Sequence, residues 1–199
     1  MRCEDIASHP DFRRLSSIPG VAVDLRYAGT NNFVGRNLYG SLDCAWLHHL
    51  AATGLARAAA LLARERPGHR VLVLDALRPH RVQLQLWKHL EGTDLRQYVA
   101  DPAMGSIHSF GMALDVNIVD AQGRELDMGS GYDEMTELSH PQFETRFLAS
   151  GELTPAQRSN RELLRLVMDR GEFRGISNEW WHFDLLDRQH VRKTFVRVE

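Results

Sequence analysis

Three observations predict a single α+β domain over residues 1–199. The chain is long enough for one sizeable core but shorter than the length at which cores usually divide. Segments with strand and helix patterns alternate along it, without an internal repeat, a low-complexity tract or a long linker. Its composition, 43% hydrophobic and 25% charged, is that of an ordinary globular protein. A chain of this size buries roughly 70% of its unfolded surface, so it needs no disulfides to fold.

The first half of the chain predicts a strand, a loop, a helix and a second strand. Residues 21–27 alternate weakly and predict a short strand, and residues 27–40 are rich in Gly and Asn, as a long loop is. Asp43 is a plausible N-cap for a helix whose apolar residues recur at helical spacing until Pro67 and Gly68 end it. The apolar run 71–74 predicts a buried strand.

The second half predicts two further helices and two strands. Residues 82–90 have a helical pattern, and residues 106–119 are strand-like on either side of a glycine. The stretch 120–123 (Asp-Ala-Gln-Gly) has the composition of a hairpin turn. Residues 154–170 open with Thr-Pro, a good N-cap and first helical residue, and end at Arg-Gly. Residues 180–186 predict the last strand.

Charge, cysteine count and hydropathy exclude several classes of protein. Twenty-four Lys and Arg against twenty-six Asp and Glu give a net charge of −2, which argues against a nucleic-acid partner. Two cysteines, Cys3 and Cys44, are too few for a disulfide scaffold, a Cys-rich zinc ribbon or an iron–sulfur centre. The first residues lack the apolar core of a signal peptide, and no window suits a membrane span. We therefore expect a cytoplasmic protein without a membrane partner.

The first segment that could carry chemistry is 106–115. His108 and Asp115 lie seven residues apart among apolar neighbours, so both are expected to be partly buried and to need partners. One interpretation is a His–Asp hydrogen bond inside a hairpin, and the other is a pair of zinc ligands. Ser106 shares a strand face with His108 and would face the same site. A serine hydrolase is disfavoured because no G-x-S-x-G elbow surrounds Ser106.

The second segment is 177–184, which holds Glu179 and His182. In a regular strand these two side chains would point to opposite faces, so a shared site requires a bulge or turn near Trp180. Taken alone, the segment could be a core strand with a packing face of two tryptophans. Taken with His108 and Asp115, it completes a set of two imidazoles and one carboxylate, with an open position and a free glutamate. That set is typical of a catalytic zinc site rather than a structural one.

At this point the residues resemble a known family. The pattern S-x-H-x-x-G-x-A-x-D followed by E-W-W-H resembles the zinc D-alanyl-D-alanine dipeptidases, within the D,D-peptidases of Hedgehog-like fold. Residues 24–28 (Asp-Leu-Arg-Tyr-Ala) and 31–35 are similar to the family's N-terminal segment. Residues 75–79 are similar to its Asp-x-Tyr-Arg-Pro, with Leu77 in place of Tyr, and residues 127–133 to its Met-Gly-x-x-Phe-Asp stretch. The likeness covers most of the chain.

The resemblance implies a mainly antiparallel central sheet with flanking helices, and one zinc ion per chain. His108, Asp115 and His182 would bind that zinc. Glu179 would be the general base, and Arg78 would stabilise the oxyanion that develops on the scissile carbonyl.

The resemblance also implies a small dipeptide as the substrate. Tyr27, Ser106 and Asp133 would bind its free amino group, and D-alanyl-D-alanine would be hydrolysed to two D-alanines. Two alternatives stay open: a zinc D,D-carboxypeptidase or endopeptidase acting on peptidoglycan peptides, and a non-catalytic zinc module of the same fold. Exposed helices also leave room for a homodimer.

Overall fold

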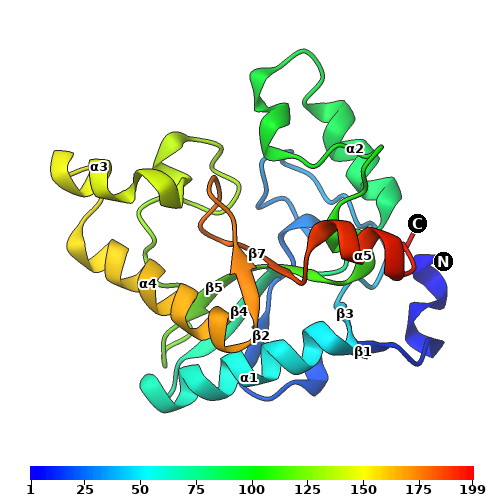
Figure 1. The fold of residues 1–199 in the computed structure, drawn as a ribbon, viewed down its shortest axis with the longest axis horizontal. Coiled ribbons are helices and arrows are strands. Elements are labelled where there is room, and N and C mark those ends of the chain that lie inside the picture. Colours follow the sequence, from blue (N-terminus) through cyan, green and yellow to red (C-terminus); the bar gives the residue numbers. More distant parts are fainter.

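The centre of the molecule is a five-stranded sheet (Figure 1), seen in a computed structural model that describes residues 1–199. In spatial order its strands are β2 (Val21–Val23), β4 (Arg70–Asp75), β5 (Ala113–Val119), β7 (His182–Leu185) and β6 (Phe173–Gly175). β2 and β4 are parallel, and every other neighbouring pair is antiparallel. This confirms an α+β fold with a mainly antiparallel central sheet.

Two long helices pack together against the sheet. α1 (His49–Glu65) contacts β4, α4 (Pro155–Arg170) contacts β6, and the two helices contact each other. In Figure 1 both run below the strands, whereas α2 (His80–His89) stands above them. The largest buried apolar cluster joins α1, α4 and the strands, and removal of that apolar surface from water is the main force that stabilises the arrangement.

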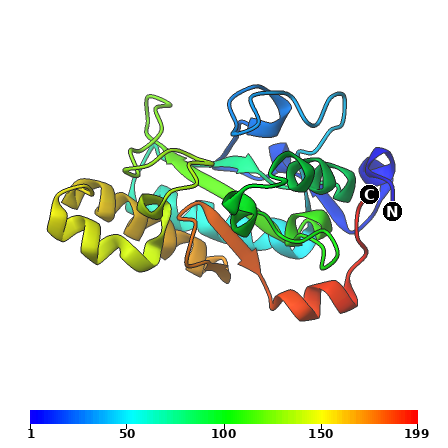
Figure 2. The ribbon, with the colours of Figure 1, turned by 90° about the horizontal axis from the view of Figure 1, so that it is seen from above.

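The chain ends lie side by side (Figure 2) and close a second apolar cluster around α2. The Met1 ammonium donates to the carbonyl of Arg197, and the amide of Glu199 donates to the carbonyl of Met1. Cys3 and Cys44 are both free thiols buried in this cluster. No helix combines the length and the apolar character that crossing a membrane requires.

The first long helix begins later than its apolar spacing predicts. Residues Trp46–His48 form β3, which pairs antiparallel with β1 (Phe12–Arg14) in a separate two-stranded sheet. The N-cap is His48, whose Nδ1 accepts from the amide of Leu50, and not Asp43. Trp46 and Leu47 fit a helical pattern equally well, and only the pairing with a distant strand decides their conformation.

The expected strand over 106–119 is wrong in its first half. Residues Ile107–Phe110 form a short 3-10 helix, η5, and the strand β5 begins at Ala113. Gly111 between them has φ +65, and a Cβ there would lie 2.8 Å from the amide nitrogen of His48. The glycine is therefore a chain reversal packed against β3 and not the middle of a strand.

The other predicted elements are confirmed, with shifted bounds. α4 has the predicted Thr154 N-cap with a full capping box, and residues 120–123 form a turn closed by the amide of Gly123 on the carbonyl of Asp120. The first and last predicted strands are shorter than expected. The pattern missed α3 (Glu144–Ser150) and α5 (Arg188–Thr194). The remaining short 3-10 helices are Cys3–Ser8, Leu15–Ser17, Arg26–Ala28, Asp94–Tyr98, Glu137–Ser139 and Pro141–Phe143.

Candidate active site

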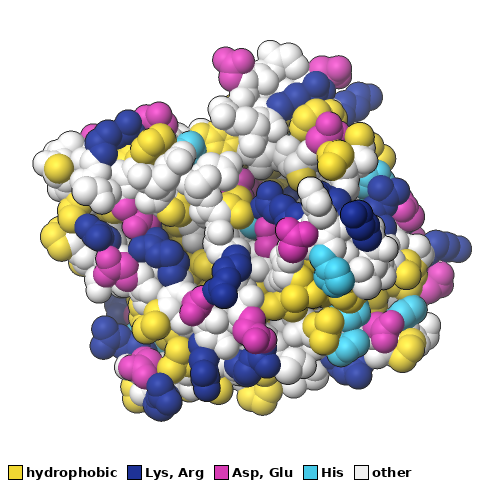
Figure 3. Space-filling view, viewed as in Figure 1, with side chains coloured by type: hydrophobic (Ala, Val, Ile, Leu, Met, Phe, Trp, Pro, Cys, Tyr) yellow, Lys and Arg dark blue, Asp and Glu magenta, His cyan; other side chains and the backbone are white.

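All of the predicted site residues line one pocket. The space-filling view shows a hollow near the centre of the face, with side chains of both charges in it (Figure 3). The residues that line the pocket come from loops and short 3-10 helices, from β5 and β7, and from α5. The predicted residues in its wall are Tyr27, Arg78, Ser106, His108, Asp115, Asp133, Glu179 and His182.

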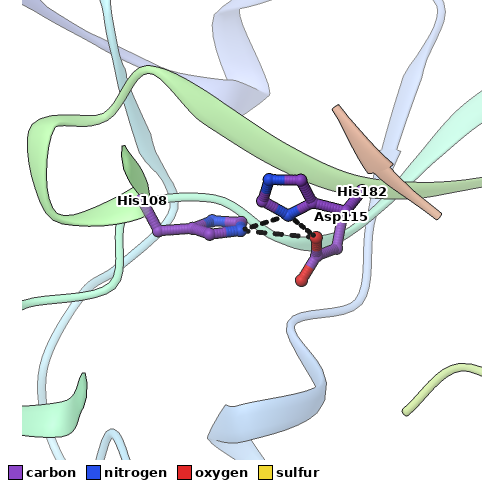
Figure 4. Close-up of side chains that lie close together, drawn as sticks. All are labelled: His108, Asp115 and His182. Carbon is purple, nitrogen blue, oxygen red and sulfur yellow. Dashed lines mark hydrogen bonds and ion pairs between the residues drawn. The ribbon is translucent and has the colours of Figure 1, made fainter. Parts of the chain in front are cut away.

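The three predicted metal ligands converge in this wall, where their side chains point toward one another (Figure 4). Asp115 of β5 and His182 of β7 are register partners on adjacent strands, and η5 brings His108 beside them. His182 Nδ1 lies 2.9 Å from Asp115 Oδ1, and His108 Nε2 lies 3.1 Å from His182 Nδ1. The three side chains are buried, and their ligand atoms all lie within 4.8 Å of one another.

The outer nitrogens of the two imidazoles show why this cluster fits a cation. His108 Nδ1 lies 2.9 Å from the carbonyl oxygen of Ala76, which can only accept, so Nδ1 carries the proton. His182 Nε2 lies 2.9 Å from Asp184 Oδ1 and carries its proton for the same reason. In neutral imidazoles the inner nitrogens then present lone pairs to each other and to Asp115. Partners of this kind on the outer nitrogen are usual for metal-binding histidines.

The electrostatics of the cluster also favour positive charge. Burial alone would lower the pKa of His182, but Asp184 and Asp115 on either side raise it to about 10. Burial would raise the pKa of Asp115, yet His108 and His182 hold it well below its usual value. A proton on His182 and a divalent cation are two ways to satisfy the same group of donors. The chemistry of the site therefore suits a metal ion.

Glu179 reaches the same pocket because the chain bends before β7. Trp180 and Trp181 are bend residues, and the strand begins only at His182, so the alternation of a regular strand does not apply. This confirms the predicted turn near Trp180, which Trp180 Nε1 anchors by donating to Ser130 Oγ at 3.0 Å. Burial raises the pKa of Glu179 to about 7. A carboxyl group with that pKa can both accept and return a proton near neutrality.

Arg78 is held in the pocket wall by several hydrogen bonds. Its Nε donates to Asp75 Oδ2 at 2.8 Å, and its Nη2 lies 2.6 Å from the same oxygen and 3.4 Å from Asp115 Oδ2. Its Nη1 donates to Gln83 Oε1 at 3.1 Å, and the guanidinium lies 5.0 Å from the centre of the Tyr27 ring. Of the five N–H groups of an arginine, this leaves one on Nη1 for a ligand.

Asp133 presents an unpartnered carboxyl oxygen to the pocket. Tyr27 donates its hydroxyl hydrogen to Asp133 Oδ1 at 3.1 Å, but Asp133 Oδ2 is buried and has no hydrogen-bond partner. Burial and the charge of Asp115 raise the pKa of Asp133 well above its usual range. Its φ of +60 is a strained conformation for a residue other than glycine, and such strain gathers at functional sites. Ser106 is buried in the pocket wall but forms no hydrogen bond with Tyr27 or Asp133.

Sequence reasoning missed the residues that hold these groups in place. Asp75 binds Arg78, Asp184 orients His182, and the Tyr132 hydroxyl donates to Asp115 Oδ2 at 3.1 Å. Tyr132 directly precedes Asp133, and Asp75 lies three residues before Arg78; both stand inside the segments that resemble the family, and that position was the available signal. Asp184 follows His182 by two residues on the same strand face, which period-two alternation predicts.

Comparison with known proteins places this geometry in a family. The model of the peptidase M15 family, described as D-ala-D-ala dipeptidase, matches residues 11–199. The D-alanyl-D-alanine dipeptidase of Escherichia coli is 38% identical over 84% of this chain and 80% of its own length. The enzyme of that name from Enterococcus faecium is 28% identical over 89% of this chain and 92% of its own. The chain thus belongs to the D-ala-D-ala dipeptidase family of M15 metallopeptidases.

Proposed function

We propose that this enzyme is a zinc-dependent dipeptidase that hydrolyses D-alanyl-D-alanine to two D-alanines. The observation that carries the proposal is the convergence of three ligand atoms, from His108, Asp115 and His182, in one pocket with an unpaired buried carboxylate. The first group suits a metal ion, and the second suits the free amino group of a small peptide. The names of the relatives supply the D configuration of the substrate. A cytoplasmic location is part of the same proposal.

Two imidazoles and one carboxylate are a ligand set that zinc uses in catalytic sites. His108 Nε2, His182 Nδ1 and Asp115 Oδ1 would hold one ion per chain. When bound, zinc acts as a Lewis acid that polarises the scissile carbonyl and makes water a better nucleophile. Ala76 and Asp184 fix the two imidazole rings so that their lone pairs already face the ion.

Glu179 acts as the general base. It lines the same pocket, and no hydrogen bond within the protein occupies its carboxylate. It takes a proton from the attacking water and then gives that proton to the departing amine. Because burial raises its pKa to about 7, the second transfer costs little at neutral pH.

Arg78 stabilises the oxyanion. The negative charge that develops on the scissile carbonyl oxygen needs a donor that is already in position, so that no reorganisation is required in the transition state. Asp75 and Gln83 fix the guanidinium and leave one N–H of Nη1 free. Arg78 therefore contributes more to the transition state than to substrate binding.

Asp133 and Tyr27, together with Ser106 in the pocket wall, bind the free amino group of the substrate. The unpartnered Asp133 Oδ2 accepts from the ammonium, and the hydroxyl of Tyr27 holds the other oxygen. A longer or N-blocked peptide has a neutral amide at that point and leaves the carboxylate uncompensated. This selects a dipeptide over the substrates of a carboxypeptidase.

The test combines metal analysis with a hydrolysis assay. We expect about one zinc per purified chain, cleavage of D-Ala-D-Ala, and little cleavage of L-Ala-L-Ala. Removal of the metal by a chelator should abolish activity, and added zinc should restore it. Full activity in metal-free protein would contradict the zinc mechanism, and preference for L-Ala-L-Ala would contradict the substrate.

A further inference from the structure

Two arginines of α5 line the pocket, and their charges are compensated differently. Arg188 and Arg192 lie four residues apart, on one face of the helix. Arg188 Nε donates to Asp184 Oδ2 at 2.6 Å, so a carboxylate already neutralises its charge. Arg192 donates from Nε and Nη2 to the carbonyl of Gly105, at 3.0 and 2.9 Å, and forms no ion pair.

Arg192 is thus an oriented cation with a neutral partner. The Gly105 carbonyl fixes the plane of its guanidinium and leaves Nη1 without a protein acceptor. A partly buried charge that lacks a counter-ion favours binding of an anion from solution. The fork of N–H groups in a guanidinium matches a carboxylate, to which it can donate two hydrogen bonds.

The position of α5 relates this cation to the rest of the pocket. In Figures 1 and 2, α5 and the loop that carries Asp133 lie on opposite sides of β7, whose first residue is the metal-ligand candidate His182. A zwitterionic dipeptide has its ammonium and its carboxylate at opposite ends, with the scissile bond between them. Arg78 keeps only one free N–H, on Nη1, and the proposed oxyanion role uses it, so Arg78 cannot also pair with the carboxylate.

We propose that Arg192 binds the C-terminal carboxylate of the dipeptide substrate. This inference rests on the proposed function and names the side chain that recognises the C-terminal end of the substrate. Asp133 and Arg192 then select for both charges and for the length between them. A peptide extended at its C-terminus places a neutral amide at Arg192 and loses the charge-assisted hydrogen bonds.

The test compares D-Ala-D-Ala with D-Ala-D-alaninamide, which lacks the terminal charge. Arg192→Gln can still donate to the Gly105 carbonyl but carries no charge. We expect it to raise KM for D-Ala-D-Ala about tenfold to a hundredfold, with a smaller change in kcat and with little effect on the amide. The preference of the unmodified enzyme for the acid over the amide should shrink by the same factor. Lys193 is an exposed neighbour on α5 outside the pocket, so Lys193→Gln should change KM and kcat for neither substrate.

Arg192→Lys provides a second variant that keeps the charge, and it should retain most of the preference for the acid. A merely structural role for Arg192 would lower activity on both substrates equally and leave the ratio unchanged, which would overturn the inference. If the unmodified protein cleaved D-Ala-D-Ala but showed no preference for the acid, only the assignment of Arg192 would fall. If it did not cleave D-Ala-D-Ala at all, the proposed function would fall and the assignment with it.

Discussion

Two carboxylates, Asp75 beneath the site and Asp133 in the pocket wall, have opposite surroundings. Asp75 ends the strand β4, and its Oδ1 accepts from the Tyr39 hydroxyl and from the amide of Ala76, the latter at 2.9 Å. Its Oδ2 accepts from Arg78 Nε at 2.8 Å. Asp133 lies in a loop, has one hydrogen bond from a tyrosine, and leaves its second oxygen unpartnered at a φ of +60.

The difference suits two different tasks in the proposed function: Asp75 positions another side chain, and Asp133 binds the substrate. On the strand side the protein supplies its own counter-charge, so Asp75 fixes Arg78 and needs nothing from solution. In the proposed function, the unpartnered oxygen of Asp133 on the loop side is left for a ligand, at a cost in stability. The group of His108, Asp115 and His182 combines both patterns, since the outer nitrogens are satisfied within the protein and the inner ligand atoms suit a cation.

The largest expected effect comes from removing an inner ligand atom. His108→Ala deletes Nε2 from the cluster, so the variant should lose its zinc and fall to background activity together. Metal content by elemental analysis and the rate of D-Ala-D-Ala cleavage measure both effects. His190→Ala, an exposed histidine of α5, is the control and should keep both. A His108→Ala protein that retained zinc and full turnover would remove His108 from the site.

Removing the base should separate chemistry from metal binding. Glu179→Ala should keep zinc but lose about 10²-fold to 10⁴-fold in kcat, because a general base is absent. Loss of zinc in this variant would instead make Glu179 a ligand.

The pH profile of the unmodified enzyme tests the same residue. Burial raises the pKa of Glu179 to about 7, and a bound cation stabilises its charged form and lowers that value. The base works only when deprotonated, so kcat should fall on the acid side, with a midpoint at or below pH 7. An enzyme that lost activity only on the alkaline side would contradict this role.

Neutralising the loop carboxylate should have a smaller effect on activity. Asp133→Asn removes the charge that pairs with the substrate ammonium but keeps the shape of the side chain. We expect kcat/KM for D-Ala-D-Ala to fall about tenfold to a hundredfold. The variant should also discriminate less against an N-acetylated substrate, because the carboxylate that disfavours a neutral amide is gone. An unchanged ratio of the two rates would place the ammonium elsewhere.

A separate effect is expected on folding stability, where the two carboxylates should respond with opposite signs. Asp75→Asn removes the charge of the carboxylate nearest to the buried Arg78, leaves only Asp115 at 3.4 Å, and should cost about 3 kcal/mol. Asp133→Asn removes an unpaired buried carboxylate and should gain on the order of 1 kcal/mol. Because the pKa of Asp133 is raised in the folded state, the folded state holds its proton as pH rises above the unfolded value, and stability falls. The gain in the free energy of unfolding of Asp133→Asn over the unmodified protein should therefore be larger at pH 7 than at pH 4, as denaturant unfolding at the two pH values measures.

The fold was predictable from the sequence where local signals decide the structure. The capping pair before α4 and the turn at 120–123 are local, and both were predicted. The start of α1 was not, because β3 forms only through its pairing with β1, more than thirty residues away. The reversal at Gly111 was read as strand because its packing against His48 has no signature in the neighbouring residues.

The candidate site was predictable as a set of residues but not as a network. The motifs predicted eight site residues, and all eight line one pocket in the structure. Glu179 is among them, and its position depends on the expected bend at Trp180. The partners that orient them, such as Asp75, and the cation Arg192 were missed. Those contacts join residues far apart in the chain, and α5 is too short to give a strong helical pattern.

The central claim is that the carboxylate of Asp133 binds the free amino group of a dipeptide. The most direct test compares two substrates on the unmodified, zinc-loaded enzyme. N-acetyl-D-Ala-D-Ala places a neutral amide against Asp133, which leaves a buried charge unpaired at a cost of several kcal/mol. Each 1.36 kcal/mol changes a rate tenfold, so kcat/KM for D-Ala-D-Ala should exceed that for the acetylated peptide by about 10² or more. Equal rates on the two substrates would contradict the account and would favour a carboxypeptidase.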